Sequence, residues 1–170
     1  EVNHGPFLID NNILLSEGCI SDASEGGAYV HNLFAGAINA WPDLGRETPY
    51  HPAHSTALAG LANVKGGDNR FFNNIFSPPT SVGLPEKLGL TSYNSREFPL
   101  LTGGNVYYNQ AKPYAKETGP VIVAGVNPGL DIDEKEDGVY LRMNIGERLV
   151  GVSTEMVTTA RLGKARVPGL

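Results

Sequence analysis

The chain has 170 residues, a formal net charge of −5 and a sequence pI near 5.3. This length fits a single domain, and the acidic balance offers no basic surface for nucleic acid or anionic lipid. Charged residues make up only 18%, whereas 21 glycines and 12 prolines favour a turn-rich all-β protein over a helical one, with a neutral or polar ligand.

The chain begins with Glu1 in the stretch EVNHGP, which has the character of the middle of a structural element. We therefore expect that an upstream segment is missing, which leaves secretion undecided. The lone Cys19 cannot form an internal disulfide or a thiolate metal site, and a small buried residue is the simpler interpretation. No apolar run approaches the roughly 20 residues that span a bilayer, so no membrane partner is expected.

A motif repeats along the first two thirds of the chain. An Asn is followed by an aliphatic residue and then by Leu or an aromatic residue in Asn12-Ile13-Leu14, Asn32-Leu33-Phe34, Asn74-Ile75-Phe76 and Asn105-Val106-Tyr107. The second interval is about twice the first, as expected of solenoid rungs with insertions. This pattern predicts a right-handed parallel β-helix with a hydrogen-bonded Asn ladder at its turns, and with the neighbouring apolar side chains in the core.

The alternative is an ordinary β-sandwich in which these runs are chance turns. A sandwich should show hairpin turns at short, even spacing, but convincing strand pairs joined by Asn-Gly or Asp-Gly are nearly absent before Asp137-Gly138. The solenoid is the preferred interpretation.

The repeat divides the chain into solenoid rungs followed by a C-terminal tail. Residues 1–112 are expected to form the rungs, interrupted by inserted loops at 40–69 and 77–102. Residues 113–170 alternate more conventionally in VIVAGV and DGVYLRMNI, and we expect a β-rich tail that packs on or caps the helix. The stretch MVTTARLGKARV would be its last element.

Two carboxylates occupy corresponding places in the repeat. Glu1 precedes Asn12 by about as many residues as Asp22 precedes Asn32, so both should lie on neighbouring rungs of one face. Paired acids can carry out glycoside hydrolysis, in which one protonates the leaving oxygen and the other attacks the anomeric carbon or activates water. Alternatively, Asp22 caps a turn and Glu1 is a solvated end residue.

The histidines are the next candidates for work at a site: His4, His31, His51 and His54. The spacing of His51 and His54 resembles a metal pair, but Pro49 and Pro52 argue against the helix that would bring them together. No metal or other cofactor is therefore expected. Hydrogen bonding to sugar hydroxyls is the functional interpretation of His51 and His54, and a solvated loop is the alternative.

Trp41 is the only tryptophan, at the start of the first insertion, with Tyr50 further along it. An exposed Trp41 would make a sugar-stacking platform, whereas a lone Trp more often fills a core. Arg46 and Arg70 could bind a carboxylate, although a salt bridge from Arg70 to Asp68 is the simpler account.

Several motifs in order resemble glycoside hydrolase family 120, the β-xylosidases built on a right-handed parallel β-helix: EVNHGPFLIDNNILLS, SEGGAYVHNLFAG, RETPYHPAHST and GGDNRFFNNIF. The resemblance spans at least residues 1–76, and the later GGNVYYNQAKP and DGVYLRMNI fit it less distinctively. It implies a retaining, exo-acting enzyme that releases xylose from the non-reducing end of xylo-oligosaccharides. The family's inserted β-sandwich domain would lie upstream.

The resemblance also implies residue roles. Glu1, which opens the EVNHGP motif, would be the general acid/base, and the nucleophilic Asp would lie about one rung earlier, outside the chain, so that the isolated chain should be inactive. Asp22, one rung beyond, would bind sugar or tune the acid/base. Glu25 stands where Gln is expected in the family. His4, His51 and His54 are carried over as substrate-binding by their place in matching motifs, and Glu25 and Trp41 are further candidates.

Two other functions remain open from the sequence. A different β-helix carbohydrate enzyme, such as an arabinofuranosidase or a polysaccharide lyase, is the first, although no clear lyase base is present. A non-catalytic β-helix that binds glycans is the second. Short oligosaccharide substrates favour a cytoplasmic over a secreted location, and the sequence is compatible with a homo-oligomer without specifying one.

Overall fold

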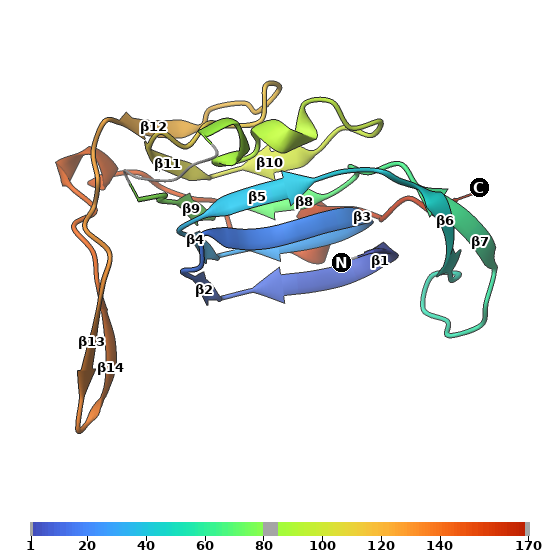
Figure 1. The fold of residues 1–170 in the computed structure, drawn as a ribbon, viewed down its shortest axis with the longest axis horizontal. Helices are drawn as coiled ribbons and strands as arrows, with labels where there is room; N and C mark the ends of the chain where they lie inside the picture. The colour runs from blue at the N-terminus through green and yellow to red at the C-terminus, as the bar shows by residue number, and fades with distance from the viewer. Residues whose placement is uncertain (1, 80–84, 169–170) are drawn as a thin grey trace.

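The computed structural model describes residues 2–79 and 85–168, whose regular secondary structure is almost entirely β-strand (Figure 1). The strands are β1 (Val2–Asp10), β2 (Ile13–Leu14), β3 (Gly18–Val30), β4 (Leu33–Phe34), β5 (Ala37–Ala40), β6 (Asp43–Tyr50), β7 (Gly60–Val64), β8 (Arg70–Phe72), β9 (Ile75–Phe76), β10 (Leu101–Gly103), β11 (Val106–Asn109), β12 (Val121–Ala124), β13 (Asp131–Lys135) and β14 (Gly138–Arg142). The short helices are η1 (Pro85–Lys87), η2 (Thr91–Tyr93), η3 (Glu147–Leu149) and α1 (Thr159–Leu162).

Two parallel sheets form the body. One has the order β1-β3-β8-β10, with β5 paired to the first part of β3, and the other has the order β12-β11-β9-β4-β2. In the second sheet Ile13 pairs with Leu33, Leu33 with Ile75, and Ile75 with Val106. Equivalent positions of the repeated motif therefore lie in register. The all-β class and the parallel pairing expected from the repeat are confirmed.

The four asparagines of the repeat form the predicted ladder. The backbone N–H and the side-chain Nδ2 of Asn12 both donate to Oδ1 of Asn32, at 3.0 and 3.1 Å. Asn32 donates in the same way to Asn74 (2.9 and 3.1 Å), and Asn74 to Asn105 (3.0 and 3.1 Å). Asn105 then donates to the Glu117 carboxylate at 2.9 Å. Asn32, Asn74 and Asn105 are buried, and the ladder supplies the hydrogen-bond partners that a buried amide requires.

The residue before each ladder asparagine adopts a left-handed backbone conformation. Asn11, His31 and Asn73 have φ of 55°, 56° and 55°, and Gly104 has φ of 67°. Gly and Asn tolerate this region best, and His is also enriched there. His31 is therefore explained by the turn, and its ring Nε2 lies 3.2 Å from Asn73 Nδ2.

Stacked aromatic rings fill the core between the sheets. The ring centroids of Phe34 and Phe76 are 5.1 Å apart, and those of Phe76 and Tyr107 are 4.8 Å apart, with interplanar angles of 13° and 4°. On the other sheet Tyr29 stacks on Phe71 at 4.5 Å. Each pair contributes about 1 kcal/mol beyond its apolar burial.

The insertions and the tail contain structure of their own. Strands β6 and β7 form an antiparallel hairpin, and η2 contributes the buried Tyr93 to the core. In the tail, β12 extends the second sheet, and the β13–β14 hairpin projects away from the body (Figure 1). The stretch MVTTARLGKARV contains the short α1 rather than a strand, because Thr158 caps a helical turn by accepting the Arg161 N–H. Across the described residues, no helix is long and apolar enough to cross a membrane.

Candidate functional site

The start of β1 pairs with the middle of β3, and this pairing brings the predicted site residues His4 and Glu25 together. Val2 lies opposite Ala23, Asn3 opposite Ser24, and His4 opposite Glu25. Glu1 lies outside the described residues. The described part of the candidate site therefore consists of the β1–β3 pair, the β6–β7 hairpin beside it, and what these elements contact.

Glu25 is a buried carboxylate with partners on three segments. Its side chain is 1% exposed. Oε1 accepts the backbone N–H groups of Lys65 at 2.7 Å and Gly66 at 3.3 Å. Oε2 accepts Nη1 of Arg166 at 3.3 Å. These contacts compensate the desolvation of the carboxylate, so that Glu25 is held in a fixed geometry.

His4 is buried beside Glu25. Its Nε2 lies 3.0 Å from the Ala62 carbonyl oxygen, which can only accept, so Nε2 carries the proton. Nδ1 then faces Glu25 Oε2 at 3.7 Å. The Tyr50 ring meets the imidazole edge-on, with centroids 6.0 Å apart. The hairpin thus fixes the ring of His4 against the sheet.

Asp22 lies within the interior and is 1% exposed. Its Oδ2 accepts the Tyr93 hydroxyl at 2.5 Å and Nδ2 of Asn69 at 3.0 Å. Burial raises the pKa of Asp22, and hydrogen bonds from Ser24 and Tyr93 oppose that shift. The carboxylate joins β3 to the two later segments that carry Asn69 and Tyr93.

The remaining predicted residues belong to the first insertion. Trp41 is half-buried, and its backbone N–H donates to the Asp22 carbonyl at 2.9 Å. His51 and His54 are exposed between β6 and β7, and His51 Nδ1 lies 3.0 Å from the Ala57 carbonyl oxygen. They are not gathered into the buried cluster of His4 and Glu25. Within residues 2–79 and 85–168, no group of three His, Cys, Asp or Glu side chains is placed to hold a metal ion.

Some contacts of the site could not be found from the sequence. Arg166 lies 141 positions from Glu25, and no motif links them. The predicted bridge from Arg70 to Asp68 is present at 3.0 Å. Arg70 also donates to the carbonyl oxygens of Leu162 and Lys164, at 2.8 and 2.5 Å, so it fastens the C-terminal segment to the sheet.

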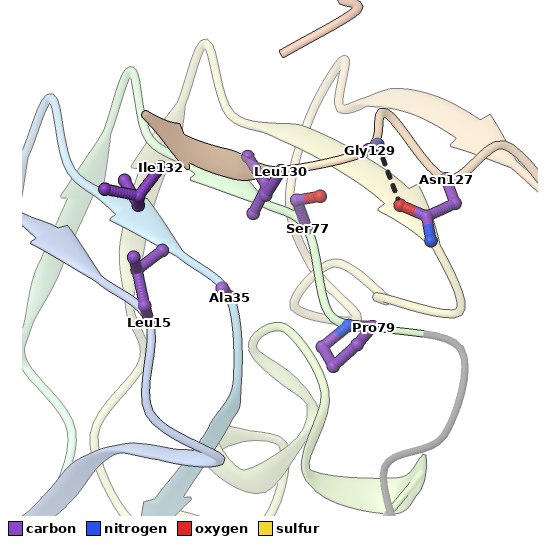
Figure 2. A pocket seen from close by; sticks show the side chains of 8 residues that line it. All are labelled: Leu15, Ala35, Ser77, Pro79, Asn127, Gly129, Leu130 and Ile132. Atoms are coloured by element: carbon purple, nitrogen blue, oxygen red, sulfur yellow. Dashed lines mark hydrogen bonds between the residues drawn. The ribbon is translucent and has the colours of Figure 1, made fainter. Parts of the chain in front are cut away.

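A separate cavity of about 260 Å³ lies at the base of the β13–β14 hairpin (Figure 2). Leu15 lines it from one segment and Leu130 and Ile132 from another, with Ser77 and Asn127 as polar neighbours. Its lining contains no carboxylate and no aromatic ring. Glycoside hydrolysis needs paired carboxyl groups, and this cavity is therefore not the candidate site.

Comparison with known proteins gives one informative likeness. The solved structure of XylC in complex with xylose matches 98% of this chain with a TM-score of 0.90 and 35% sequence identity. This chain shares the fold of part of XylC. It spans 30% of the XylC chain. No family model and no curated protein matches the chain.

Proposed function

We propose that this chain is part of a β-xylosidase of the glycoside hydrolase family 120 type, built on a right-handed parallel β-helix. The likeness to XylC, a protein whose structure holds xylose, carries the proposal. The in-register strands and the Asn ladder support the solenoid, because stacked rungs are what such a repeat builds. The substrate would be a xylo-oligosaccharide, cleaved from its non-reducing end.

In this proposal Glu1 is the general acid/base. It protonates the glycosidic oxygen while an Asp carboxylate attacks the anomeric carbon, giving a xylosyl-enzyme ester and a free leaving sugar. Glu1 then removes a proton from water, whose oxygen displaces the Asp and releases xylose. The nucleophile would come from the part of the XylC-like protein that this chain does not cover.

The described contacts are consistent with that geometry. A retaining enzyme needs its two carboxyl groups about 5 Å apart, which is close to the spacing of neighbouring parallel strands. Val2 and Ala23 pair on the neighbouring parallel strands β1 and β3, and a strand one rung before β1, carrying the nucleophile, would have the same spacing. His4 and Glu25 would support the acid/base from beside it, and His51, His54 and Trp41 would contact sugar from the insertion.

The test uses the full-length protein that contains this chain and the variant Glu1→Gln. Loss of an acid catalyst should lower kcat strongly for xylobiose, whose leaving group needs a proton. The same substitution should lower the glycosylation rate much less for 2,4-dinitrophenyl β-xyloside, because its leaving group departs without a proton. Glu17→Gln, at an exposed glutamate, is the matched control and should leave both rates unchanged.

Equal losses on the two substrates would show that Glu1 is not the acid. Faster hydrolysis of an aryl α-arabinofuranoside than of the matching β-xyloside would replace xylose by arabinose as the substrate. Glycan binding without hydrolysis of either would favour a binding module and refute the enzyme.

A further inference from the structure

The C-terminal segment, residues 162–168, lies across the first sheet and reaches the candidate site. Arg70 holds it through the carbonyl oxygens of Leu162 and Lys164. Asp68 Oδ2 accepts the backbone N–H of Arg166 at 2.7 Å. The backbone of this segment is therefore fixed from Leu162 up to Arg166, from which the side chain projects.

The Arg166 side chain bridges two segments. Its guanidinium lies 4.0 Å from the centroid of the Phe98 ring, and Nη1 lies 3.3 Å from Glu25 Oε2. The Arg166 side chain is 37% exposed, while Glu25 is buried. A planar cation stacked on a ring has few ways to turn. It is thus well placed to fix the orientation of one carboxylate oxygen.

We propose that Arg166 is a positioning residue of the active site, acting on Glu25 and through it on His4; this rests on the function proposed above. Glu25 Oε1 is held by two backbone N–H groups, and Oε2 accepts its hydrogen bond from Arg166. His4 Nε2 donates to Ala62, while the buried Nδ1 makes no hydrogen bond within the described residues and lies 3.7 Å from Oε2. Removing the guanidinium should let the carboxylate and the imidazole shift together.

A purely structural role for Arg166 would be to attach the tail. Arg161 provides a matched control, because it lies in the same part of the chain and its guanidinium also covers a ring, that of Phe72 at 5.0 Å. Arg161 pairs with Glu155 instead of a site residue. Loss of Arg161 should therefore loosen the tail without changing His4.

The experiment compares Arg166→Met, Arg166→Lys and Arg161→Met in the full-length protein. We expect Arg166→Met to lower kcat for an aryl β-xyloside about tenfold with little change in KM, since small misplacements near reacting groups have large kinetic effects. The NMR signals of the His4 imidazole should shift. Arg166→Lys should have kcat and His4 signals between those of Arg166→Met and wild type. Arg161→Met should have the kcat and the His4 signals of wild type.

Unchanged His4 signals in Arg166→Met, or the same changes in Arg161→Met, would overturn the positioning role. If Arg166→Met fails to fold, Arg166→Lys provides the same comparison with the charge retained. If the wild-type protein does not hydrolyse xylosides, the proposed function fails separately. The His4 signals then still decide whether Arg166 positions Glu25 and His4.

Discussion

Replacing Asn74 by Ala tests whether the Asn ladder stabilises the fold. Asn74 is fully buried, and its Oδ1 accepts both the backbone N–H and Nδ2 of Asn32. Its Nδ2 donates to Asn105 Oδ1 and to the Tyr29 carbonyl. Ala would leave the buried Asn32 N–H without its acceptor, at about 1–3 kcal/mol, and would remove the two hydrogen bonds donated by Nδ2, at about 1 kcal/mol each. We therefore expect a loss of about 3–5 kcal/mol.

The control is Asn12→Ala, at the exposed end of the same ladder. Asn12 gives Nδ2 to Asn32 and to the Asp10 carbonyl, where water can replace it, so a loss of at most about 1 kcal/mol is expected. Urea unfolding monitored by circular dichroism gives both free energies. Equal losses for the two variants would refute the argument that burial makes the ladder stabilising.

Burial raises the pKa of Glu117 above its ordinary value of 4.5, so the folded state favours the protonated acid. The free energy of unfolding should therefore fall as pH rises from about 4.5 through the raised pKa, and a pH series of urea unfolding curves should show Glu117→Gln to be flatter there. Phe76→Ala, between Phe34 and Tyr107, should cost about 3–5 kcal/mol by the same assay, whereas the exposed Ile122→Ala should cost less than about 1 kcal/mol. A similar loss at both positions would count against a packed aromatic stack.

The repeat was predictable because three consecutive residues in each rung define its motif. Each rung repeats Asn, an aliphatic residue and a large apolar residue, and one-dimensional stacking turns that recurrence directly into a ladder and an aromatic stack. The irregular intervals did not obscure it. What the motif did not reveal was the left-handed residue before each asparagine, because Asn11, His31, Asn73 and Gly104 share a conformation and not a chemistry.

The candidate site was less predictable, for a physical reason. The 20-residue interval from Asn12 to Asn32 holds from Phe7 opposite Gly27 onward, but a register shift between His4 and Phe7 places His4 opposite Glu25 instead of Ser24. The repeat alone does not predict that pairing. The partners Ala62, Tyr93 and Arg166 come from insertions and the tail, which interrupt the repeat. Their contacts depend on tertiary packing, for which the spacing of the motif gives no rule.

The Asn ladder has a direction. From Asn12 to Asn105 each Nδ2 donates one hydrogen toward the next member of the row, and Oδ1 of Asn32, Asn74 and Asn105 each accepts from the previous one. The side-chain carbonyl dipoles of these three therefore point the same way along the stack, as peptide dipoles do in a helix. Glu117 receives the last donated hydrogen, which places a carboxylate at the positive end of that row. A cation at this position would be repelled by the donated N–H of Asn105. The direction of the ladder therefore favours a negatively charged group at its last member.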